Sequence, residues 1–314
     1  MSGIQFPRGK QFAFTIIDDT DCATVENVRP IYECLYRLGF RTTKTVWPLP
    51  GHHPQDANAP AQTLADPDYL EFIRQLERWG FEIALHNARS YSSTREETRA
   101  GLETFHALLG HYPRIHANHM FNREDLYWGS ARLDHWPVRW LYQGLRLVRK
   151  LPPDSDGHRR DSPYFWGDLC ERHIHYVRGF TFPIVNVLRV NPTLPYRDPK
   201  RPHARLWFSA CDGTNVYEFN HLLSVENQEQ LEQEKGICIV ATHLAAGFVQ
   251  DGKVTPVAER LLTRLAQRSG WFVPVSELLH FLAEQFGIRT LPAEERHRME
   301  WLWLLSRARL SRYK

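Results

Sequence analysis

The chain has 314 residues, of which 42% are hydrophobic and 24% are charged, a composition typical of a globular protein with one large α/β domain or two smaller ones. No stretch approaches the roughly 18 consecutive apolar residues of a spanning helix, and the start MSGIQFPRGK leads us to expect no secretory signal. The net charge of +3 gives no general case for nucleic-acid binding, and five cysteines without metal-type spacing favour a reducing cytoplasm.

Strand-like and helix-like segments alternate along the first half of the chain. The run QFAFTIIDDTD at 11–21 predicts a buried strand that ends in Asp18, Asp19 and, two residues on, Asp21. Three carboxylates this close raise one another's pKa unless a cation or a reaction uses them. The segments that follow are predicted as helices at 24–38, 68–79 and 94–109, with a capping box at Thr94 and Glu97, and as strands at 42–49, 81–88 and 114–120.

The second half continues the alternation after a long loop. Strands are predicted at 176–182, 205–210 and 236–244 and helices at 224–234, 254–268 and 276–286, and the segment WFVPV at 271–275 completes the pattern. This order indicates an α/β fold, with a parallel sheet covered by helices that is either open or closed into a barrel.

Two further segments are basic and amphipathic. In 135–150 one helical face carries Trp136, Trp140, Leu141, Leu145 and Val148, with Arg139, Arg146, Arg149 and Lys150 nearby. The C-terminal segment 287–314 is predicted as a helical tail, with Trp301, Leu304, Leu305 and Ala308 on one face and six Lys or Arg against one Glu over 296–314. Such helices either lie on anionic membrane surfaces or pack on the barrel or on a second subunit.

Polar residues of metal-binding or acid–base type stand at the ends of four predicted strands. The first strand ends in Asp18 and Asp19, the third in His86, and the late strand in His243. The fourth carries His116, Asn118 and His119. Functional groups of parallel α/β folds gather at the carboxyl ends of the strands, and one carboxylate with two imidazoles suits a zinc-type ion. A second carboxylate and a third histidine remain for general base and general acid.

These segments resemble the polysaccharide deacetylases, the NodB-like carbohydrate esterases. FTIIDDTD resembles their first motif, Thr-Phe-Asp-Asp-Gly, IVATHLA resembles their late strand ending in histidine, and GFEIALHNARS stands where their second motif, His-Ser/Thr-x-x-His, is expected. The resemblance implies a distorted (β/α) barrel as a single domain over 1–286, followed by the tail at 287–314. It implies Asp18 as base, Asp19 and His86 as ligands of one divalent metal ion, zinc foremost, and His243 as the acid.

The sequence departs from the family pattern at the second metal histidine. That position is Ser90, Thr20 replaces the first-motif glycine, and RIHANHM replaces the third motif. We expect the next strand to supply the missing imidazole, from His119, because it lies nearer the strand's carboxyl end than His116 does. His116 and Ser90 remain the alternatives.

Four residues are candidates for substrate binding. Asp168 follows the aromatic cluster of SPYFWGDL, Arg89 follows His86, and Trp128 is a candidate groove wall. Asn118 lies between the two histidines of the fourth strand.

The leading hypothesis is a metal-dependent hydrolase that removes an N-acetyl or similar acyl group from a sugar or glycoconjugate in the cytoplasm, with peripheral membrane contact through the basic segments. The rival enzyme hypothesis is a glycoside hydrolase that uses two carboxylates such as Asp18 and Asp168. The third is a non-catalytic saccharide-binding relative, for which the loss of the second-motif histidine is the best argument.

Overall fold

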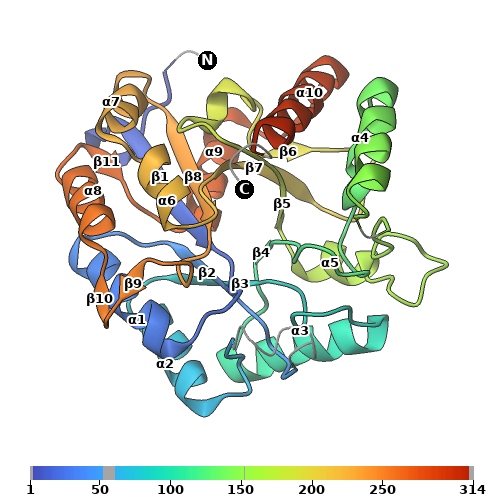
Figure 1. Ribbon diagram of the computed structural model, residues 1–314, viewed down its shortest axis with the longest axis horizontal. Coiled ribbons are helices and arrows are strands. Elements are labelled where there is room, and N and C mark those ends of the chain that lie inside the picture. The colour runs from blue at the N-terminus through green and yellow to red at the C-terminus, as the bar shows by residue number, and fades with distance from the viewer. Residues whose placement is uncertain (1–2, 52–60, 152, 311–314) are drawn as a thin grey trace.

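The computed structural model describes residues 3–51, 61–151 and 153–310, and its centre is a closed barrel of parallel strands ringed by helices (Figure 1). The barrel strands are β1 (Phe12–Asp18), β2 (Thr43–Val46), β3 (Glu82–Leu85), β4 (Ile115–His116), β5 (Tyr176–Phe182), β7 (Leu206–Asp212) and β8 (Ile237–Thr242). Each pairs in parallel with the next, and β8 closes the ring onto β1. The expected distorted (β/α) barrel is therefore confirmed.

The distortion is visible in the pairing of β1. This strand pairs with β8 over six residue pairs, from Ala13–Ile237 to Asp18–Thr242, but with β2 only at Ile17 and Asp18. The short strand β11 (Gly270–Trp271) pairs with the beginning of β1 on the side that β2 leaves open. All seven residues of β1 are buried, as expected for a strand that is covered on both faces.

Helices cover the outside of the barrel. They are α1 (Val25–Arg37), α2 (Pro67–Arg78), α3 (Arg95–Leu109), α4 (Trp136–Val148), α5 (Gly167–His173), α6 (Val216–Leu222), α7 (Val225–Gln233), α8 (Pro256–Ala266), α9 (Val275–Phe286) and α10 (Ala293–Leu310). The capping box at Thr94 and Glu97 forms at the start of α3 as the sequence predicts. None of the described helices has the length and apolar character needed to cross a membrane.

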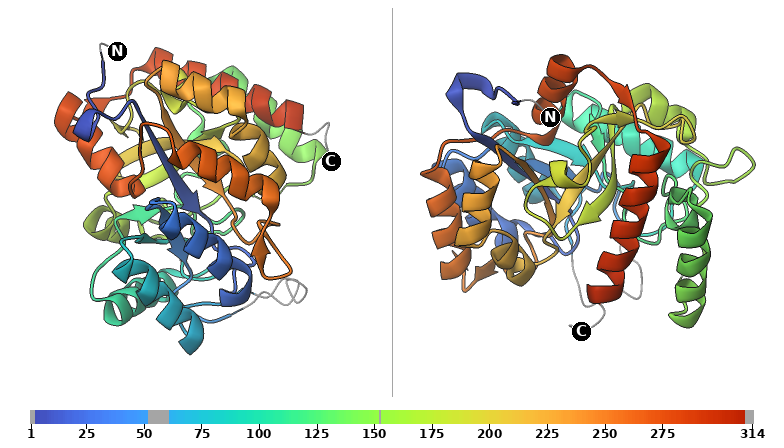
Figure 2. Two further views of the ribbon diagram at one scale, coloured as in Figure 1. Left: turned by 90° about the vertical axis from the view of Figure 1, so that its left-hand side faces the viewer. Right: turned by 90° about the horizontal axis from the view of Figure 1, so that it is seen from above.

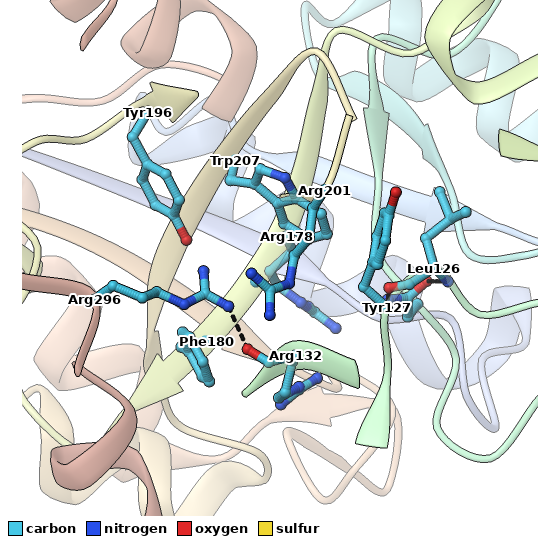
Figure 3. A pocket seen from close by; sticks show the side chains of 11 residues that line it. Leu126, Tyr127, Arg132, Arg178, Phe180, Tyr196, Arg201, Trp207 and Arg296 are labelled. Atoms are coloured by element: carbon cyan, nitrogen blue, oxygen red, sulfur yellow. Dashed lines mark hydrogen bonds between the residues drawn. The ribbon is translucent and has the colours of Figure 1, made fainter. Parts of the chain in front are cut away.

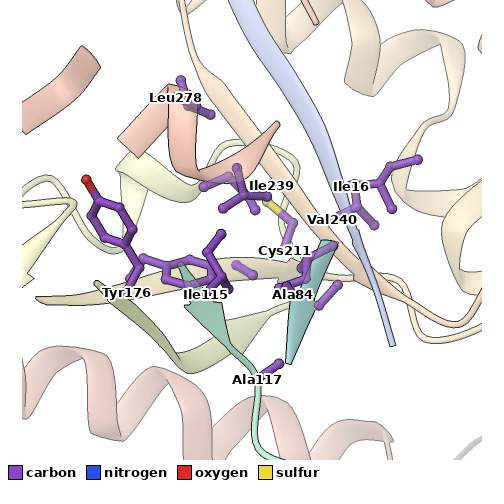
Figure 4. Close-up of a cluster of buried hydrophobic side chains, with 14 of the residues drawn as sticks. Ile16, Ala84, Ile115, Ala117, Tyr176, Cys211, Ile239, Val240 and Leu278 are labelled. Carbon is purple, nitrogen blue, oxygen red and sulfur yellow. The ribbon is translucent and has the colours of Figure 1, made fainter. Parts of the chain in front are cut away.

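A continuous hydrophobic core fills the barrel and the space beneath its helices. Figure 4 shows part of this core, to which β1, β3, β4 and β8 contribute Ile16, Ala84, Ile115 and Ile239. These side chains are almost completely buried. The carboxyl ends of the strands are thereby held at one rim of the barrel, where polar residues follow them.

At one flank of the barrel, α10 and α4 lie side by side (Figures 1 and 2). Met299, Trp303 and Leu304 of α10 are buried, and Arg307 forms an ion pair with Asp212 at the end of β7. The tail helix therefore packs on the barrel. The remaining short elements are η1 (Pro7–Gly9), η3 (Gly129–Arg132), η4 (Val187–Arg189), β6 (Tyr196–Arg197), β9 (Val249–Gln250), β10 (Lys253–Val254) and β12 (Arg289–Thr290).

Two sequence-based expectations differ from the structure. The fourth strand covers only Ile115–His116 instead of 114–120, because the chain beyond it turns to make side-chain hydrogen bonds. The short helices α5 and α6, each of seven residues, have no counterpart in the sequence-based prediction. Segments this short carry too little apolar periodicity to be recognised.

Candidate metal centre and active site

Three histidines and one aspartate meet at the carboxyl-terminal rim of the barrel. His86 directly follows β3, His243 directly follows β8, and His119 lies three residues beyond β4. Asp21 lies in the turn after β1, in which the Ala23 amide donates to the Thr20 carbonyl. This turn carries the carboxylate of Asp21 among the three imidazoles.

The Asp21 carboxylate is the centre of the cluster. Its Oδ2 lies 3.0 Å from Nε2 of His86, and its Oδ1 lies 2.9 Å from Nε2 of His119. Nε2 of His243 lies 3.4 Å from Oδ2. All three imidazoles therefore present the same ring nitrogen to one carboxylate.

The opposite ring nitrogens are held by oxygen acceptors. Nδ1 of His86 is 2.9 Å from the Ala117 carbonyl, and Nδ1 of His243 is 2.8 Å from the Thr214 carbonyl. A carbonyl oxygen only accepts, so each Nδ1 is the donor. In His119, Nδ1 lies 3.2 Å from Oδ1 of Asn122. The Nε2 atoms are thus left for a proton or a metal ion.

Asp21, His86 and His119 fit a divalent metal ion. One ligand atom from each lies within 4.8 Å of the other two. The set of two imidazoles and one carboxylate is one that zinc favours when it keeps positions open for water and substrate. Metal-bound histidines commonly donate their second ring N–H to a protein oxygen, as His86 does to Ala117.

Burial and charge set the protonation of the cluster. Burial alone would raise the pKa of Asp21, but its hydrogen bonds with the three histidines hold that pKa well below its ordinary value. Burial opposes the charged form of His119 and of His243, yet the Asp21 carboxylate raises the pKa of each to about 9. Without a metal ion, an ionised Asp21 therefore lies beside protonated His119 and His243.

A second carboxylate, Asp19, lies beside the cluster and is held by an arginine. Nη1 and Nη2 of Arg178 donate to its two oxygens at 2.8 and 2.6 Å. Burial tends to raise the pKa of Asp19, but the Arg178 guanidinium lowers it below the ordinary value. Oδ1 of Asp19 is 3.9 Å from Nδ1 of His86. Asp19, expected from the sequence as a metal ligand, therefore faces Arg178, and Asp21 holds the place among the histidines.

Asp18, expected from the sequence as the base, lies in the core and not in the cluster. Its Oδ2 is 2.8 Å from Nζ of Lys44 and accepts a hydrogen bond from the Tyr32 hydroxyl at 2.8 Å. Its Oδ1 accepts from the Leu244 amide at 2.7 Å. The side chains of Asp18 and Lys44 are fully buried, so this carboxylate contacts neither solvent nor the cluster. Side chains alternate between the two faces of β1, and the Asp18 side chain lies on the face that packs against Tyr32 of α1.

Asn87 orders the segments that carry His86 and His119. It has a positive φ of 59°, and its Nδ2 donates to Glu124 and Asp125 at 3.0 and 2.8 Å. Its Oδ1 accepts from the backbone amide of His119 at 3.2 Å. Burial raises the pKa of Glu124 to about 7 and that of Asp125 well above its ordinary value.

The two alternatives to His119 lie outside the cluster. His116 is fully buried, its Nε2 is 2.9 Å from Oδ1 of Asn118, and burial lowers its pKa to about 3. The Ser90 hydroxyl donates to the Gly51 carbonyl at 3.4 Å. His119 lies beyond the end of β4, so strand alternation does not decide between the two histidines.

The four candidate substrate-binding residues each contact different partners. Asp168 forms an ion pair with Arg95, at 2.6 and 2.7 Å, in a part-exposed position. Nη1 of Arg89 donates to the Tyr91 hydroxyl at 2.8 Å. The ring of Trp128 lies 3.7 Å from the guanidinium carbon of Arg132, and Asn118 bonds with the backbone of Leu126. The structure does not bring these four residues together.

Three residues of this region escaped the sequence reasoning. The first-motif pattern favours the two adjacent aspartates Asp18 and Asp19, so it predicts no role for Asp21. Lys44 and Arg178 each stand in an otherwise apolar strand, TTKTVW and YVRGFTF. A charged side chain inside a buried strand needs a counter-charge. The charged residue within each apolar strand therefore indicates a buried acidic partner, which is Asp18 for Lys44 and Asp19 for Arg178.

Comparisons with known proteins identify the fold. No protein-family description matches the sequence, and no curated protein matches it. Among solved structures, a polysaccharide deacetylase from Pseudomonas aeruginosa matches with a TM-score of 0.54 and 13% identity over 90% of this chain and 95% of that one. A polysaccharide deacetylase from Mycobacterium smegmatis matches with a TM-score of 0.51 and 14% identity over 93% and 97%. An allantoinase matches with a TM-score of 0.51 and 13% identity over 90% and 94%.

Proposed function

We propose that this protein is a metal-dependent hydrolase that removes an N-acetyl or similar acyl group from a sugar or glycoconjugate. The observation that carries the proposal is the convergence of Asp21, His86 and His119 at the rim of a polysaccharide-deacetylase barrel. Two of the solved proteins that share the fold are named as polysaccharide deacetylases, and the matches cover 93% and 90% of this chain.

In this proposal Asp21, His86 and His119 hold one divalent ion, zinc foremost. The bound ion would supply Lewis acidity toward an acyl carbonyl and lower the pKa of a water molecule. The Ala117 carbonyl fixes the tautomer of His86, and Asn122 orients His119, so both Nε2 atoms are directed before any ion binds.

Asp19 is the proposed general base. It is an ionised carboxylate next to the cluster, and the two hydrogen bonds from Arg178 fix its orientation. His243 is the proposed general acid, because the Asp21 carboxylate raises its pKa to about 9 and its Nδ1 donates to the Thr214 carbonyl. The proton would pass from Nε2 of His243 to the nitrogen of the leaving amine.

We expect Asp19→Asn to lower kcat by about 10²–10⁴-fold, the range that a general base contributes, while the protein keeps its metal ion. Acetate release from N-acetylated oligosaccharides and elemental analysis on the same samples give the two readouts. Asp161→Asn removes an exposed carboxylate that pairs with Arg159, and it serves as the matched control. An Asp19→Asn enzyme with wild-type turnover would refute the assignment.

The geometry gives no support to a two-carboxylate glycoside hydrolase. Asp18 is enclosed by Lys44 and Tyr32, and Asp168 pairs with Arg95. Hydrolysis that persists in EDTA, with new reducing ends and no acetate, would favour that reaction over deacylation. The hypothesis of a non-catalytic saccharide-binding relative depends on the loss of the second-motif histidine, whose position is Ser90. In the proposed metal site His119 supplies that second imidazole, so the loss at Ser90 no longer argues against catalysis.

Peripheral contact with an anionic membrane through α4 is a further part of the proposal. Its outward side exposes Trp136, Trp140, Leu141, Leu147 and Val148. Arg139, Arg149 and Lys150 are exposed beside them, and α4 contains no acidic residue. An apolar face with tryptophans and flanking cations suits the interface of an anionic bilayer. A cytoplasmic location, supported by the buried cysteines Cys34, Cys170, Cys211 and Cys238, completes the proposal.

We expect the wild-type protein to co-sediment with vesicles that contain 30% phosphatidylserine more than with neutral vesicles, by about tenfold. The double variant Trp136→Ala/Trp140→Ala should lose most of this binding, because it removes the largest apolar side chains of the exposed face. Tyr217→Ala, which removes an equally exposed aromatic ring from α6, is the control. Equal sedimentation of all three proteins would rule out α4 as the membrane contact.

A further inference from the structure

The segment after β1 carries the proposed metal ligand Asp21, and an arginine holds only one part of it. Arg178 of β5 donates to both carboxylate oxygens of Asp19. Figure 3 shows the Arg178 side chain in the same region as Arg132 and Arg296. The charged contacts of Asp21 within the described chain are instead the three histidines. Arg178 therefore orients Asp19 and is not a partner of Asp21.

A pair of hydroxyl groups holds the residue that precedes Asp21. Oγ1 of Thr20 lies 3.0 Å from the hydroxyl oxygen of Tyr69 in α2, which is 49 residues away in the sequence. Both side chains are completely buried. Thr20 stands where the family pattern has glycine, a residue without a side chain to make this contact. The contact is therefore a feature of this chain and not of the family motif.

The Tyr69 side chain is itself held in place. Tyr69 lies in the first turn of α2, and Phe72, one turn further along the helix, packs against it with 6.4 Å between the ring centroids. Burial raises the pKa of the Tyr69 hydroxyl, while the nearby charge of Lys44 opposes that rise. The hydroxyl is therefore neutral and can either donate to Thr20 or accept from it.

The position of Asp21 depends on how the two ends of its turn are held. The Ala23 amide donates to the Thr20 carbonyl at 3.0 Å, and the Ala23 carbonyl accepts from the Gln62 amide at 2.8 Å. Backbone hydrogen bonds thus hold the Ala23 end, whereas the Thr20 side chain anchors the other end on Tyr69. A shift of Thr20 would move Asp21 relative to the histidines, and metal sites need their ligands within about 0.5 Å of the productive geometry.

We propose that Tyr69 is a positioning residue of the metal centre, which fixes the turn that carries Asp21 through the Thr20 hydroxyl. This inference rests on the proposed function, because it takes Asp21 as a metal ligand. Groups that orient metal ligands contribute about 10–100-fold to metal affinity. Tyr69 acts through an intermediate residue, so the loss of its hydroxyl should weaken zinc binding by about tenfold, the lower end of this range.

The test is a competitive titration of zinc against a chelator, with the full chain as wild type, Tyr69→Phe, Thr20→Val and the double variant. Each single variant should bind zinc about tenfold more weakly than the wild type. The double variant should bind no more weakly than either single variant, because all three remove the same hydrogen bond. Thr20→Ser keeps the hydroxyl and should bind zinc as tightly as the wild type.

A purely structural role of the hydroxyl pair makes a different prediction. In the double variant two apolar side chains of similar shape replace the pair, so urea denaturation of the metal-free protein should show stability close to that of the wild type. Its zinc affinity should nevertheless remain low. Tyr32→Phe is the matched control, because it removes a buried hydroxyl that donates to Asp18 and not to the Asp21 turn. It should lower the stability and leave the zinc affinity unchanged.

Two results would overturn the inference while the metal centre remains. The first is wild-type zinc affinity in Tyr69→Phe, or in Thr20→Val if Tyr69→Phe does not fold. The second is a zinc affinity that follows stability, with Tyr32→Phe weakened as much as Tyr69→Phe. A wild-type protein that binds no divalent ion, or an Asp21→Asn variant with wild-type affinity, would instead overturn the proposed metal site and this inference with it.

Discussion

Replacing Asp21 by asparagine is expected to weaken divalent-metal binding by about 100-fold or more and to abolish hydrolysis with it. Asp21 contributes the only carboxylate that lies between Nε2 of His86 and Nε2 of His119 in the cluster, at 3.0 and 2.9 Å. Changes to groups that only support metal ligands already cost 10–100-fold in affinity, so loss of a charged ligand should cost at least as much. Elemental analysis and competitive titration with a chelator give the affinity.

Asp19→Asn is the matched comparison, because it removes the neighbouring carboxylate and leaves Asp21 in place. It should keep the metal ion and lose turnover. The opposite pattern, with metal lost from Asp19→Asn and retained by Asp21→Asn, would return the ligand role to the residue that the first-motif resemblance favours. The two variants therefore separate the structural assignment from the motif assignment.

The order of the barrel elements could be predicted from the sequence, but the roles of the three aspartates could not. Apolar runs such as FAFTIID and ICIVAT become β1 and β8, because continuous apolar segments between helices are typical of strands covered on both faces. His86 and His243 follow from the same rule, since each stands directly after a predicted strand.

The aspartates depend on partners that are far away in the chain. Asp18 pairs with Lys44, Asp19 with Arg178, and Asp21 with three histidines, over separations of 26 to 222 residues. Local spacing contains no information on which carboxylate meets which partner. The end of β1 at Asp18 and the turn at Thr20 decide it, because the turn ends the alternation that a continued strand would impose.

Removing one partner of the Asp18–Lys44 pair is expected to lower the free energy of unfolding by about 3–5 kcal/mol, because it leaves the other charge buried and uncompensated. Both side chains are fully buried, and Nζ of Lys44 lies 2.8 Å from Oδ2 of Asp18. Burial opposes the charged form of Lys44, but the Asp18 carboxylate raises its pKa above the ordinary value. Urea denaturation of Asp18→Asn and of Lys44→Met measures the effect.

An exposed ion pair provides the control. Arg78 and Glu71 lie 2.7 Å apart with side chains that are 60% and 65% exposed, and Glu71→Gln should change stability by less than about 1 kcal/mol. The double variant Asp18→Asn/Lys44→Met should lose less than the sum of the two single losses, because it leaves no unpaired charge. Additive losses would show that the two side chains are not coupled.

The single variant Asp18→Asn also tests the role of general base that the sequence predicts for Asp18. A base that acts on water must reach it, whereas Asp18 is enclosed by Lys44, Tyr32 and the Leu244 amide. Folded Asp18→Asn should therefore retain its metal ion and its turnover per folded molecule, although less of it is folded. An Asp18→Asn protein with wild-type stability and no turnover would identify Asp18 as the base and contradict the buried ion pair. The ratio of activity to folded fraction distinguishes these outcomes, because destabilisation lowers the folded fraction and loss of a catalytic group lowers the activity of each folded molecule.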